Sequence, residues 1–384
     1  MGLAISVGKA ERHMKILHIA DIGFYKGGIS HALHQSICNE NDTGEIDSCL
    51  MTISKNIVVP EKIGFSCVLF DKANMNGQIK GISPDIAIFH SFYKLEYLLL
   101  ARVLKKKNIA YLIKPHGAFS MSCRKKSRNK KRIADIFAFN RFLRGAAGII
   151  YLNLEERKNS YVDARRNYYL PNGIIPDAYD LKTRKTDVKT IRLLFLGRID
   201  VYHKGIDLLM EGLSIINKKK LDYGIEVDIY GGKDKRTHTE LIKMAKRRGL
   251  KEIIKFHDWV SGEDKEKVFL ESDIFILTSR YEGMPMGVLE AISKGMPCLL
   301  SEYTNMAEML SRENAGWKVD MDPKRMAEDI LEGIRQFRER PEFWQRNAYK
   351  LGKRMNWGNL MPQYIDTYSQ IIRDAGFGVL KNKI

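Results

Sequence analysis

Two carboxylates, Glu282 and Glu290, lie eight residues apart around a loop that is broken by Gly283, Pro285 and Gly287. The loop leads into an apolar helical pattern. The first N–H groups of a helix have no intrahelical partner, and the helix dipole favours an anion there. We therefore expect an anion at this loop, between two acids that bind hydroxyls. The alternative interpretation is one surface glutamate and one glutamate on a helix face.

Two cations precede this loop by about eighty residues. An apolar strand pattern at 193–196 runs directly into Gly197 and Arg198, and Lys204 with Gly205 opens the next helical pattern. In a parallel α/β sheet, ligands bind beyond the carboxyl ends of the strands. An arginine fork and a lysine point charge there suit phosphate oxygens. Each residue alone could be a solvated charge, but with the two acids they outline a site for a nucleotide diphosphate-sugar.

These motifs, together with Gly295-Met296-Pro297, resemble the retaining GT-B glycosyltransferases of family 4. The resemblance spans residues 14–372 and is strongest over 191–300. It implies an α/β fold in which two Rossmann-like parallel-sheet domains face a central cleft. The implied activity is a metal-independent glycosyltransferase (EC 2.4), without a cofactor, that moves a hexose-type sugar from a nucleotide diphosphate-sugar to an acceptor hydroxyl. The implied acceptor is a lipid-linked glycan in capsule, O-antigen or exopolysaccharide biosynthesis.

The resemblance also assigns roles to single residues. Arg198 and Lys204 would stabilise the leaving diphosphate, Glu282 would bind the donor sugar, and Glu290 would bind the ribose. His116, after a strand that ends at Lys114, would contact the transferred sugar. The remaining implied donor-binding residues are Gly28, Asn172, Gly197, Trp259, Val260, Met284, Pro285, Met286 and Gly287. Thr278-Ser279 and Met284-Pro285-Met286 depart from the common family pattern, and Pro285 has no N–H to offer a phosphate.

Simpler interpretations exist for several of these positions. The pairs Gly27-Gly28 and Asn172-Gly173 are also common turn sequences, and a lone histidine such as His116 is often a capped or core residue. The full Gly-x-Gly-x-x-Gly fingerprint is missing after the first strand, which argues against a nicotinamide or flavin enzyme.

Alternating strand and helix patterns predict two parallel sheets. The predicted strands are 15–20, 67–70, 86–89, 110–114 and 148–152 in the first half, and 192–196, 225–230, 253–256, 274–277 and 297–300 in the second. A break rich in Pro, Gly and Asn at 171–176 marks the boundary. We therefore expect an acceptor-side domain at 14–172 and a nucleotide-sugar domain at 173–357. A terminal helix at about 358–376 would pack back on the first domain.

Composition indicates a globular protein with an unusual charge. The chain has 384 residues, 44% of them hydrophobic, and no apolar run near the length of a membrane span. Its five scattered cysteines indicate a reduced, cytoplasmic protein and offer no zinc site. The net charge is +18, and segment 124–144 has nine Lys/Arg against one Asp, a net of +8, interleaved with apolar residues. That segment could contact an anionic membrane at the inner face of the plasma membrane, or could bury its apolar face in the domain.

Three other classes of protein fit the sequence less well. A nucleic-acid-binding protein would explain the charge, but no helix-turn-helix, zinc or RNA-recognition signature is present, so no nucleic-acid partner is expected. A nucleotide-sugar epimerase with the same fold would need acid and base groups beyond His116. Asp320-Met321-Asp322 is the one Asp-x-Asp that could suggest a metal-dependent enzyme, but capping of the helix that starts at Pro323 is sufficient to explain it.

Overall fold

The computed structural model describes residues 13–23, 27–55, 63–125, 139–175, 189–232 and 235–381. Most of the basic segment 124–144 lies outside these ranges. The structure therefore does not test the predicted membrane contact of that segment, of which it describes helix α6 (Asn140–Gly145) and the end of helix α4 (Met121–Lys125).

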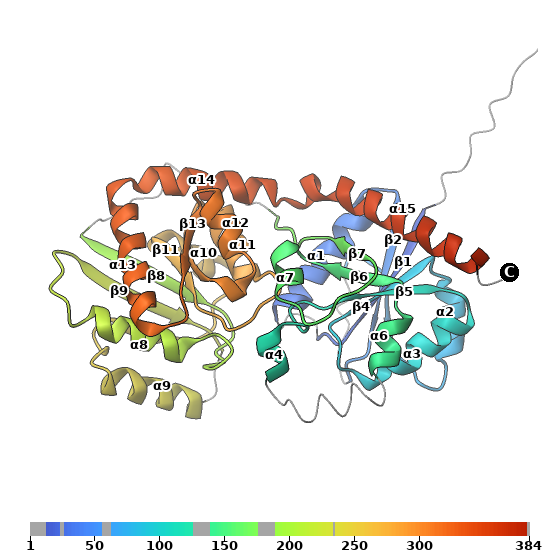
Figure 1. The fold of residues 1–384 in the computed structure, drawn as a ribbon, viewed down its shortest axis with the longest axis horizontal. Helices are drawn as coiled ribbons and strands as arrows, with labels where there is room; N and C mark the ends of the chain where they lie inside the picture. Colours follow the sequence, from blue (N-terminus) through green and yellow to red (C-terminus); the bar gives the residue numbers. More distant parts are fainter. Residues whose placement is uncertain are drawn as a thin grey trace, which may run out of the picture.

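The first half of the chain forms a parallel sheet (Figure 1). Within the described residues its order is β3-β2-β1-β4-β5-β6-β7. The strands are β1 (Met14–Ala20), β2 (Ile46–Thr52), β3 (Cys67–Leu69), β4 (Ile86–His90), β5 (Ala110–Lys114), β6 (Gly148–Tyr151) and β7 (Asn167–Tyr169). The helices, besides α4 and α6, are α1 (Gly28–Asp42), α2 (Met75–Ile82), α3 (Leu95–Lys106) and α7 (Leu154–Lys158).

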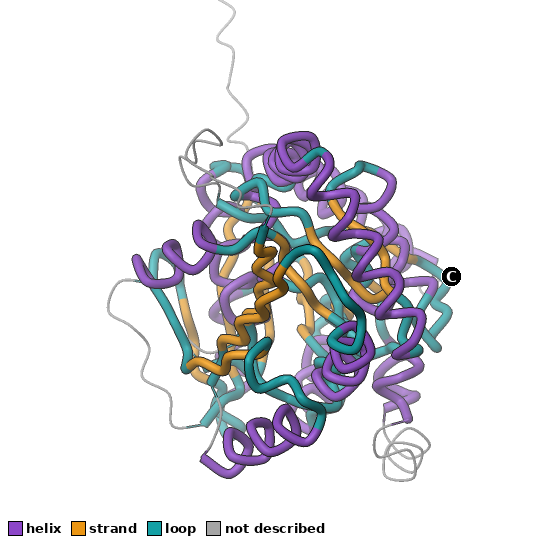
Figure 2. The backbone as a smooth tube through the Cα atoms, turned by 90° about the vertical axis from the view of Figure 1, so that its left-hand side faces the viewer, coloured by secondary structure: helices purple, strands orange, loops and turns teal. Residues whose placement is uncertain are grey.

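The second half forms another parallel sheet, in the order β10-β9-β8-β11-β12-β13. Its strands are β8 (Thr190–Leu196), β9 (Gly224–Tyr230), β10 (Ile254–His257), β11 (Ile274–Leu277), β12 (Cys298–Ser301) and β13 (Gly316–Val319). Its helices are α8 (Ile206–Ile216), α9 (Lys235–Arg247), α10 (Gly262–Glu271), α11 (Met286–Ser293), the short η3 (Glu302–Thr304), α12 (Ala307–Arg312) and α13 (Pro323–Glu339). All four residues of β11 are buried, as expected for a parallel strand covered on both faces. Figure 2, viewed from the side of this half, shows helices around the strands.

Both sheets reverse their strand order at one point. In the first sheet β1 pairs with β2 on one side and β4 on the other, and in the second sheet β8 pairs with β9 and β11. The loops beyond these strands diverge to opposite faces, which leaves a crevice at the carboxyl ends. The predicted α/β class with two parallel sheets is confirmed, and each sheet has the topology that creates a ligand site.

The two halves are joined by two crossings that lie side by side. Ile174 N–H donates to Met355 O at 2.9 Å, and Trp357 N–H donates to Ile174 O at 3.3 Å. Helix α14 (Pro341–Arg354) lies on the second half, and helix α15 (Trp357–Lys381) returns over the first (Figure 1). A side chain at Gly173 would collide with the Trp357 ring, only 2.5 Å from its Cβ. The crossings are therefore packed against each other without space for a larger residue.

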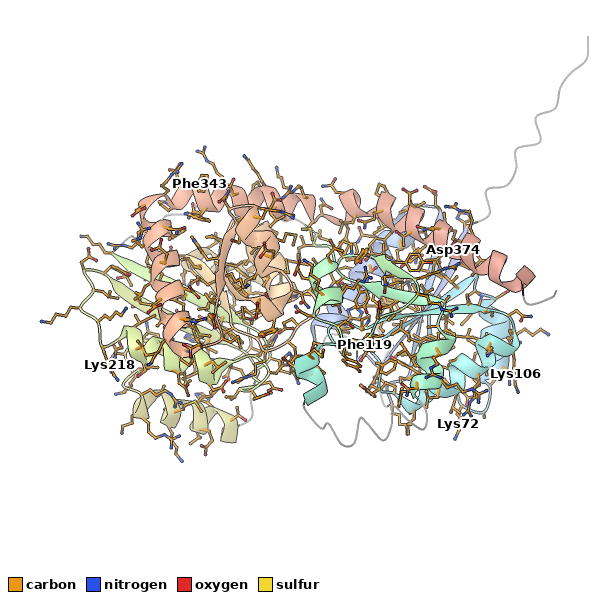
Figure 3. All side chains as sticks on the ribbon, in the orientation of Figure 1. Lys72, Lys106, Phe119, Lys218, Phe343 and Asp374 are labelled. Atoms are coloured by element: carbon orange, nitrogen blue, oxygen red, sulfur yellow. The ribbon has the colours of Figure 1, made fainter. Side chains whose placement is uncertain are left out.

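Helix α15 completes the core of the first half. Its buried face packs in one cluster with residues of β1, β2, β4, β5 and β6; the cluster includes Trp357, Leu360, Tyr364, Tyr368, Ile371, Ile16, Ile46, Ile86, Leu112 and Ile150. Near its end Asp374 accepts a hydrogen bond from Tyr168 Oη at 3.0 Å. Figure 3 places Asp374 over the first half, on the same side of the molecule as Lys72 and Lys106 and far from Lys218 and Phe343 of the second half.

Candidate functional site

A buried ion pair lies at the centre of the predicted site. Lys204 Nζ is 2.6 Å from Glu282 Oε1, and the two side chains are only 13% and 12% exposed. Ser279 Oγ donates to the same oxygen at 2.8 Å. Burial raises the pKa of Glu282, but the charges of Lys204 and His203 and the hydrogen bonds from Lys204 and Ser279 outweigh it, so that this pKa lies below its usual value. Glu282 is therefore an ionised acceptor that faces a cation.

A close backbone contact positions Lys204. The next residue, Gly205, has φ +65°, and a Cβ there would lie 2.0 Å from the carbonyl oxygen of Thr278. The Thr278 hydroxyl also donates to the Gly205 carbonyl at 3.1 Å. Only glycine combines this conformation with such a close approach. The loop after β8 is thereby fixed against the end of β11, which brings Lys204 to Glu282.

Arg198 lies at the same edge of the sheet but is much more exposed. Its side chain is 70% exposed, and its Nη2 lies 3.9 Å from Asp200 Oδ2 and 3.4 Å from Nδ1 of His203. The His203 ring stacks on Tyr281 with centroids 4.0 Å apart. Arg198 thus carries a guanidinium at the mouth of the site, held by two weak contacts that a phosphate could replace.

Helix α11 begins directly after the Glu282 loop. Pro285 is its N-cap residue, so the N–H groups of Met286 and Gly287 precede the first intrahelical hydrogen bonds, which Val288 and Leu289 donate to Pro285 O. A Cβ at Gly287 would lie 3.2 Å from Leu196 O, so the helix start packs on the end of β8. Pro285 itself has no N–H, as expected from the sequence. The N–H groups without an intrahelical partner at this helix end are therefore those of Met286 and Gly287.

Glu290 lies about one turn into α11, beside a cavity of about 290 Å³. Lys265 Nζ binds its Oε1 at 2.7 Å, and the two side chains are 22% and 12% exposed. Both halves of the chain line this cavity, with His31 and Gln35 from α1, Ile174 and Ile175 from the crossing, and Glu266, Ser293 and Lys294 beside Lys265 and Glu290. A ligand hydroxyl that binds Glu290 would share this carboxylate with Lys265.

Predicted residues of the first half meet the same loop. His116 and Gly117 have positive φ angles of 50° and 81°, and a Cβ at Gly117 would lie 2.6 Å from the carbonyl of Glu282. Asn172 Nδ2 donates to Met284 O at 3.2 Å, and a Cβ at Gly28 would be 3.9 Å from the Met286 side chain. The structure thus brings His116, Gly28 and Asn172 to the segment 282–286.

Trp259 and Val260 lie apart from this cluster. They follow β10, which is two strands from β8 in the sheet. Trp259 is 55% exposed, and Val260 packs against the core of the second half. An exposed indole here is free to offer a flat apolar face to a ligand.

Sequence reasoning missed the asparagines that hold the Glu282 loop. Asn305, with φ +60°, donates from Nδ2 to Glu282 O at 2.7 Å. From the first half, Asn153 Nδ2 donates to Asn305 O at 2.8 Å, and Asn159 Nδ2 donates to Asn305 Oδ1 at 2.7 Å. Asn305 therefore connects the loop that carries Glu282 to the first half of the chain through hydrogen bonds. No motif in the sequence links three asparagines so far apart.

A second missed residue, Glu156, supports Gly117. Its carboxylate accepts from Gly117 N–H and Leu152 N–H, both at 2.6 Å, and its side chain is buried. Burial raises the pKa of Glu156 to about 7, although these two hydrogen bonds and the charge of Lys114 oppose the shift. Glu156 thereby fixes the backbone that touches Glu282.

Two further predictions concern metals and helix caps. Among the residues that the structure describes, no group of three or more His, Cys, Asp or Glu side chains could hold a metal ion. Asp322 accepts hydrogen bonds from the N–H groups of Lys324 and Arg325 and so caps α13, as predicted for the Asp-x-Asp sequence.

Within the described ranges, no helix is both long and apolar enough to span a bilayer.

Comparison with known proteins gives matches over both halves. The sequence model of the family Glycosyl transferases group 1 matches residues 180–351. An uncharacterised 41.2 kDa protein in the cps region of Klebsiella pneumoniae is 23% identical over 83% of this chain and 89% of its own length. The GDP-mannose:cellobiosyl-diphosphopolyprenol alpha-mannosyltransferase of Komagataeibacter xylinus is 24% identical, with 56% of this chain and 54% of that protein covered. The mannosylfructose-phosphate synthase of Agrobacterium fabrum is 28% identical, with 31% of this chain and 27% of that protein covered. The chain thus spans about a quarter to a half of the latter two relatives.

Solved structures match the whole fold. A glycosyltransferase from Rickettsia africae has a TM-score of 0.70 at 13% identity, covering 94% of this chain and 99% of that one. The Anabaena protein HepE, in complex with UDP and glucose, has a TM-score of 0.68 at 15% identity, covering 93% and 100%. These likenesses show that the two sheets have the GT-B arrangement.

Proposed function

Because the chain belongs to the group 1 glycosyltransferases and has their GT-B fold, we propose that it transfers a sugar from a nucleotide diphosphate-sugar to an acceptor hydroxyl, with retention of anomeric configuration. One observation carries the proposal: the buried Lys204–Glu282 pair, at 2.6 Å, lies where the second half meets the backbone of His116 and Gly117. A cation and a hydroxyl-binding acid at this contact can hold the phosphate and the sugar on either side of the bond that breaks.

The chemistry that these residues perform is stabilisation of the leaving group. As the bond between the sugar and the diphosphate breaks, negative charge develops on the phosphate oxygens. We assign Lys204, the exposed Arg198 guanidinium and the N–H groups of Met286 and Gly287 to these oxygens, because preorganised donors in a partly buried site stabilise developing charge effectively. Because these groups supply the neutralising charge, turnover should persist in EDTA.

The acids divide the rest of the donor between them. Glu282 is ionised and accepts hydrogen bonds, so it binds hydroxyls of the sugar. Glu290, beside the cavity of about 290 Å³, binds the ribose diol. Trp259 follows β10, two strands from β8 in the sheet, and offers its exposed face to the base. Glu282 and Glu290 follow β11, and Trp259 follows β10, so all three lie after the carboxyl ends of strands in the second sheet, where ligands of such sheets bind.

The acceptor is proposed from the relatives. The Komagataeibacter enzyme is named for a cellobiosyl-diphosphopolyprenol acceptor, and another relative is an O-antigen chain mannosyltransferase of Escherichia coli. We infer that this chain likewise glycosylates a lipid-linked glycan during surface polysaccharide biosynthesis, at the cytoplasmic face of the membrane. The basic segment 124–144 would then approach the anionic lipid surface.

A ligand screen with a matched pair of variants tests the proposal. Thermal unfolding is measured with uridine, guanosine and adenosine diphosphate-sugars, because a ligand that binds only the folded state raises the melting temperature. We expect one donor class to raise it and to be consumed with release of the nucleoside diphosphate. Glu290→Gln should weaken binding of that diphosphate by about tenfold, since it loses a charge-assisted hydrogen bond to the ribose. Glu328→Gln, on the exposed face of α13, should not. Equal affinities in the two variants, or no response to any donor, would contradict the proposal.

A further inference from the structure

A row of four buried or half-buried side chains leads from the core of the first half to the cleft. His116 Nε2 lies 2.9 Å from His90 Nδ1, His90 Nε2 lies 2.9 Å from His18 Nδ1, and His18 Nε2 lies 2.9 Å from Glu40 Oε2. Glu40, His18 and His90 are 0%, 1% and 3% exposed, whereas His116 is partly exposed. We call these four residues the histidine row. Each imidazole in it uses both ring nitrogens except His116, whose Nδ1 has no partner among the described residues.

Glu40 determines which atom donates in each hydrogen bond of the row, because an ionised carboxylate can only accept hydrogen bonds. Its Oε1 accepts from Ser36 Oγ at 2.6 Å and from Tyr368 Oη at 3.2 Å, and its Oε2 accepts from Ser48 Oγ and from His18. Four donors therefore occupy the carboxylate, and an ionised carboxylate has four lone-pair positions for them. Burial raises the pKa of Glu40, but the electrostatic interaction with His18 and the hydrogen bonds from His18, Ser36 and Ser48 lower it below its usual value.

The donor and acceptor roles of each ring follow from those of the ring before it. His18 must carry a proton on Nε2 to donate to Glu40. With His18 neutral, its Nδ1 is unprotonated, so His90 must donate from its Nε2. A protonated His18 would instead donate from Nδ1 and reverse the remaining hydrogen bonds. A neutral His90 in turn has a bare Nδ1, so His116 must donate from its Nε2. Because a neutral imidazole carries one ring proton, Nδ1 of His116 is left as an acceptor.

We propose that Glu40, His18 and His90 are positioning residues that hold His116 in the Nε2–H tautomer, so that its Nδ1 accepts a hydrogen bond from a hydroxyl of the sugar bound in the cleft. This inference rests on the proposed function for the identity of the ligand as a sugar. The tautomer follows from the row with His18 neutral and does not depend on the ligand.

The surroundings keep His90 and His116 neutral. Burial lowers the pKa values of His90 and His116 well below the usual value, and the nearby Lys114 charge lowers both further. Lys114 Nζ contacts Tyr364 Oη of α15 at 3.3 Å, and Glu156 of α7 contacts the same segment through Gly117 N–H. The titratable groups around the row are thus Lys114, Glu156, Tyr364 and Tyr368. With Lys114 charged at neutral pH, a second positive charge on the adjacent imidazoles is disfavoured.

The backbone at His116 is held in an uncommon conformation. Its φ of 50° is left-handed, which is infrequent for a residue other than glycine. The conformation persists because Gly283 of the second half packs on His116, where a Cβ on Gly283 would lie 2.8 Å from the His116 carbonyl carbon. The His116 and His90 rings are stacked with centroids 5.1 Å apart. The ring is therefore fixed both by the row and by contact with the Glu282 loop.

The direct test is the protonation of the His116 ring nitrogens, read from ¹⁵N chemical shifts of histidine-labelled protein at neutral pH. The chain has nine histidines, and the His116 signals are assigned as those lost in His116→Gln. We expect Nε2 protonated and Nδ1 bare in the wild type. A protonated Nδ1 would overturn the proposal, and this measurement needs no variant of the buried row to fold.

Glu40→Gln tests the cause. An amide in place of the carboxylate can donate to His18 Nε2, which reverses every hydrogen bond in the row and places a proton on His116 Nδ1. Ser36→Ala is the matched control, because it removes one hydrogen bond from the same carboxylate and leaves the direction unchanged. We expect Glu40→Gln to switch the His116 tautomer, and Ser36→Ala to keep it. An unchanged tautomer in folded Glu40→Gln would overturn the proposal.

Kinetics separate this inference from the proposed function. Glu40→Gln should reduce kcat/KM by about tenfold to hundredfold, as for a lost buried hydrogen bond, while affinity for the nucleoside diphosphate stays unchanged because His116 contacts the sugar alone. An equal loss in Ser36→Ala, or weaker diphosphate binding in Glu40→Gln, would count against it. Absence of turnover in the wild type would refute the proposed function, whereas the tautomer measurement would still decide the row.

Discussion

Replacement of Lys204 by methionine separates its structural role from its catalytic role. The ammonium is 2.6 Å from Glu282, and both side chains are nearly buried. Methionine keeps an unbranched apolar stem that reaches as far as Cε of lysine, but it lacks the ammonium group and its charge. The variant therefore leaves Glu282 with Ser279 at 2.8 Å and His203 at 3.7 Å as its remaining partners. We expect the variant to fold and to lose activity.

The expected sizes of the two losses differ. Removal of one partner from a fully buried pair costs about 3–5 kcal/mol, but Glu282 keeps two neighbours and some exposure, so we expect about 1–3 kcal/mol of unfolding free energy to be lost. Removal of one donor that stabilises the developing charge in a transition state reduces kcat by about 10²–10³-fold. The loss of turnover should therefore exceed what unfolding of the variant explains, since a protein of ordinary stability stays folded after this loss.

The assay combines urea unfolding with release of the nucleoside diphosphate under saturating donor. The matched control is Arg248→Met, which removes a partly exposed cation 3.0 Å from Glu211 at the end of α9, away from the strand ends. The control should lose some stability and keep full turnover. Turnover of Lys204→Met within about threefold of wild type would show that Lys204 only supports Glu282, and would refute its assignment to the diphosphate.

Two further predictions concern the backbone and a buried charge. Gly205→Ala should destabilise the protein by more than the ~1–2 kcal/mol that the left-handed conformation alone costs, because its Cβ would lie 2.0 Å from Thr278 O. Gly249→Ala, at a similar φ of +72° with its nearest atom 3.8 Å away, should cost only the conformational part, and equal losses in urea unfolding would contradict the contact. Burial lowers the pKa of Lys114 to about 8, so the unfolded chain binds more protons between that value and the usual lysine pKa. Stability of the wild type relative to Lys114→Met should therefore rise with pH, by about 2 kcal/mol from pH ~7.5 to ~9.5, and a flat difference would show that Lys114 titrates normally.

Sequence patterns located strands whose residues are mostly apolar. Strands β5 (Ala110–Lys114) and β11 (Ile274–Leu277) have the predicted bounds. Strand β2 (Ile46–Thr52) was missed because its Asp and Ser residues interrupt the apolar run, although Ser48 is fully buried where it donates to Glu40. A polar residue inside a sheet has no signal in a pattern of hydrophobicity, since its partner lies on another element.

The donor-side residues were predictable because short segments at strand ends carry them. Arg198, Lys204 and Glu282 each follow an apolar strand or open a helix, and parallel strand ends meet at one edge. The pairing of Lys204 with Glu282 was not predicted, because both residues were assigned directly to the ligand. Asn305 and Glu40 were not found either, since a lone asparagine or a helical glutamate reads as an exposed residue until its neighbours in space are known.

Helix α15 has a consequence for the order in which the protein is made. The face of β1, β4 and β5 that carries Ile16, Ile86 and Leu112 is covered by residues 357–371. During synthesis on the ribosome, more than two hundred residues must be added after β5 before that cover exists, as follows from the sequence positions. Until then this apolar face of the N-terminal half stays exposed to solvent, and chaperones bind surfaces of this kind. Because Tyr368 also donates to Glu40, the carboxylate gains its last donor only when this helix docks.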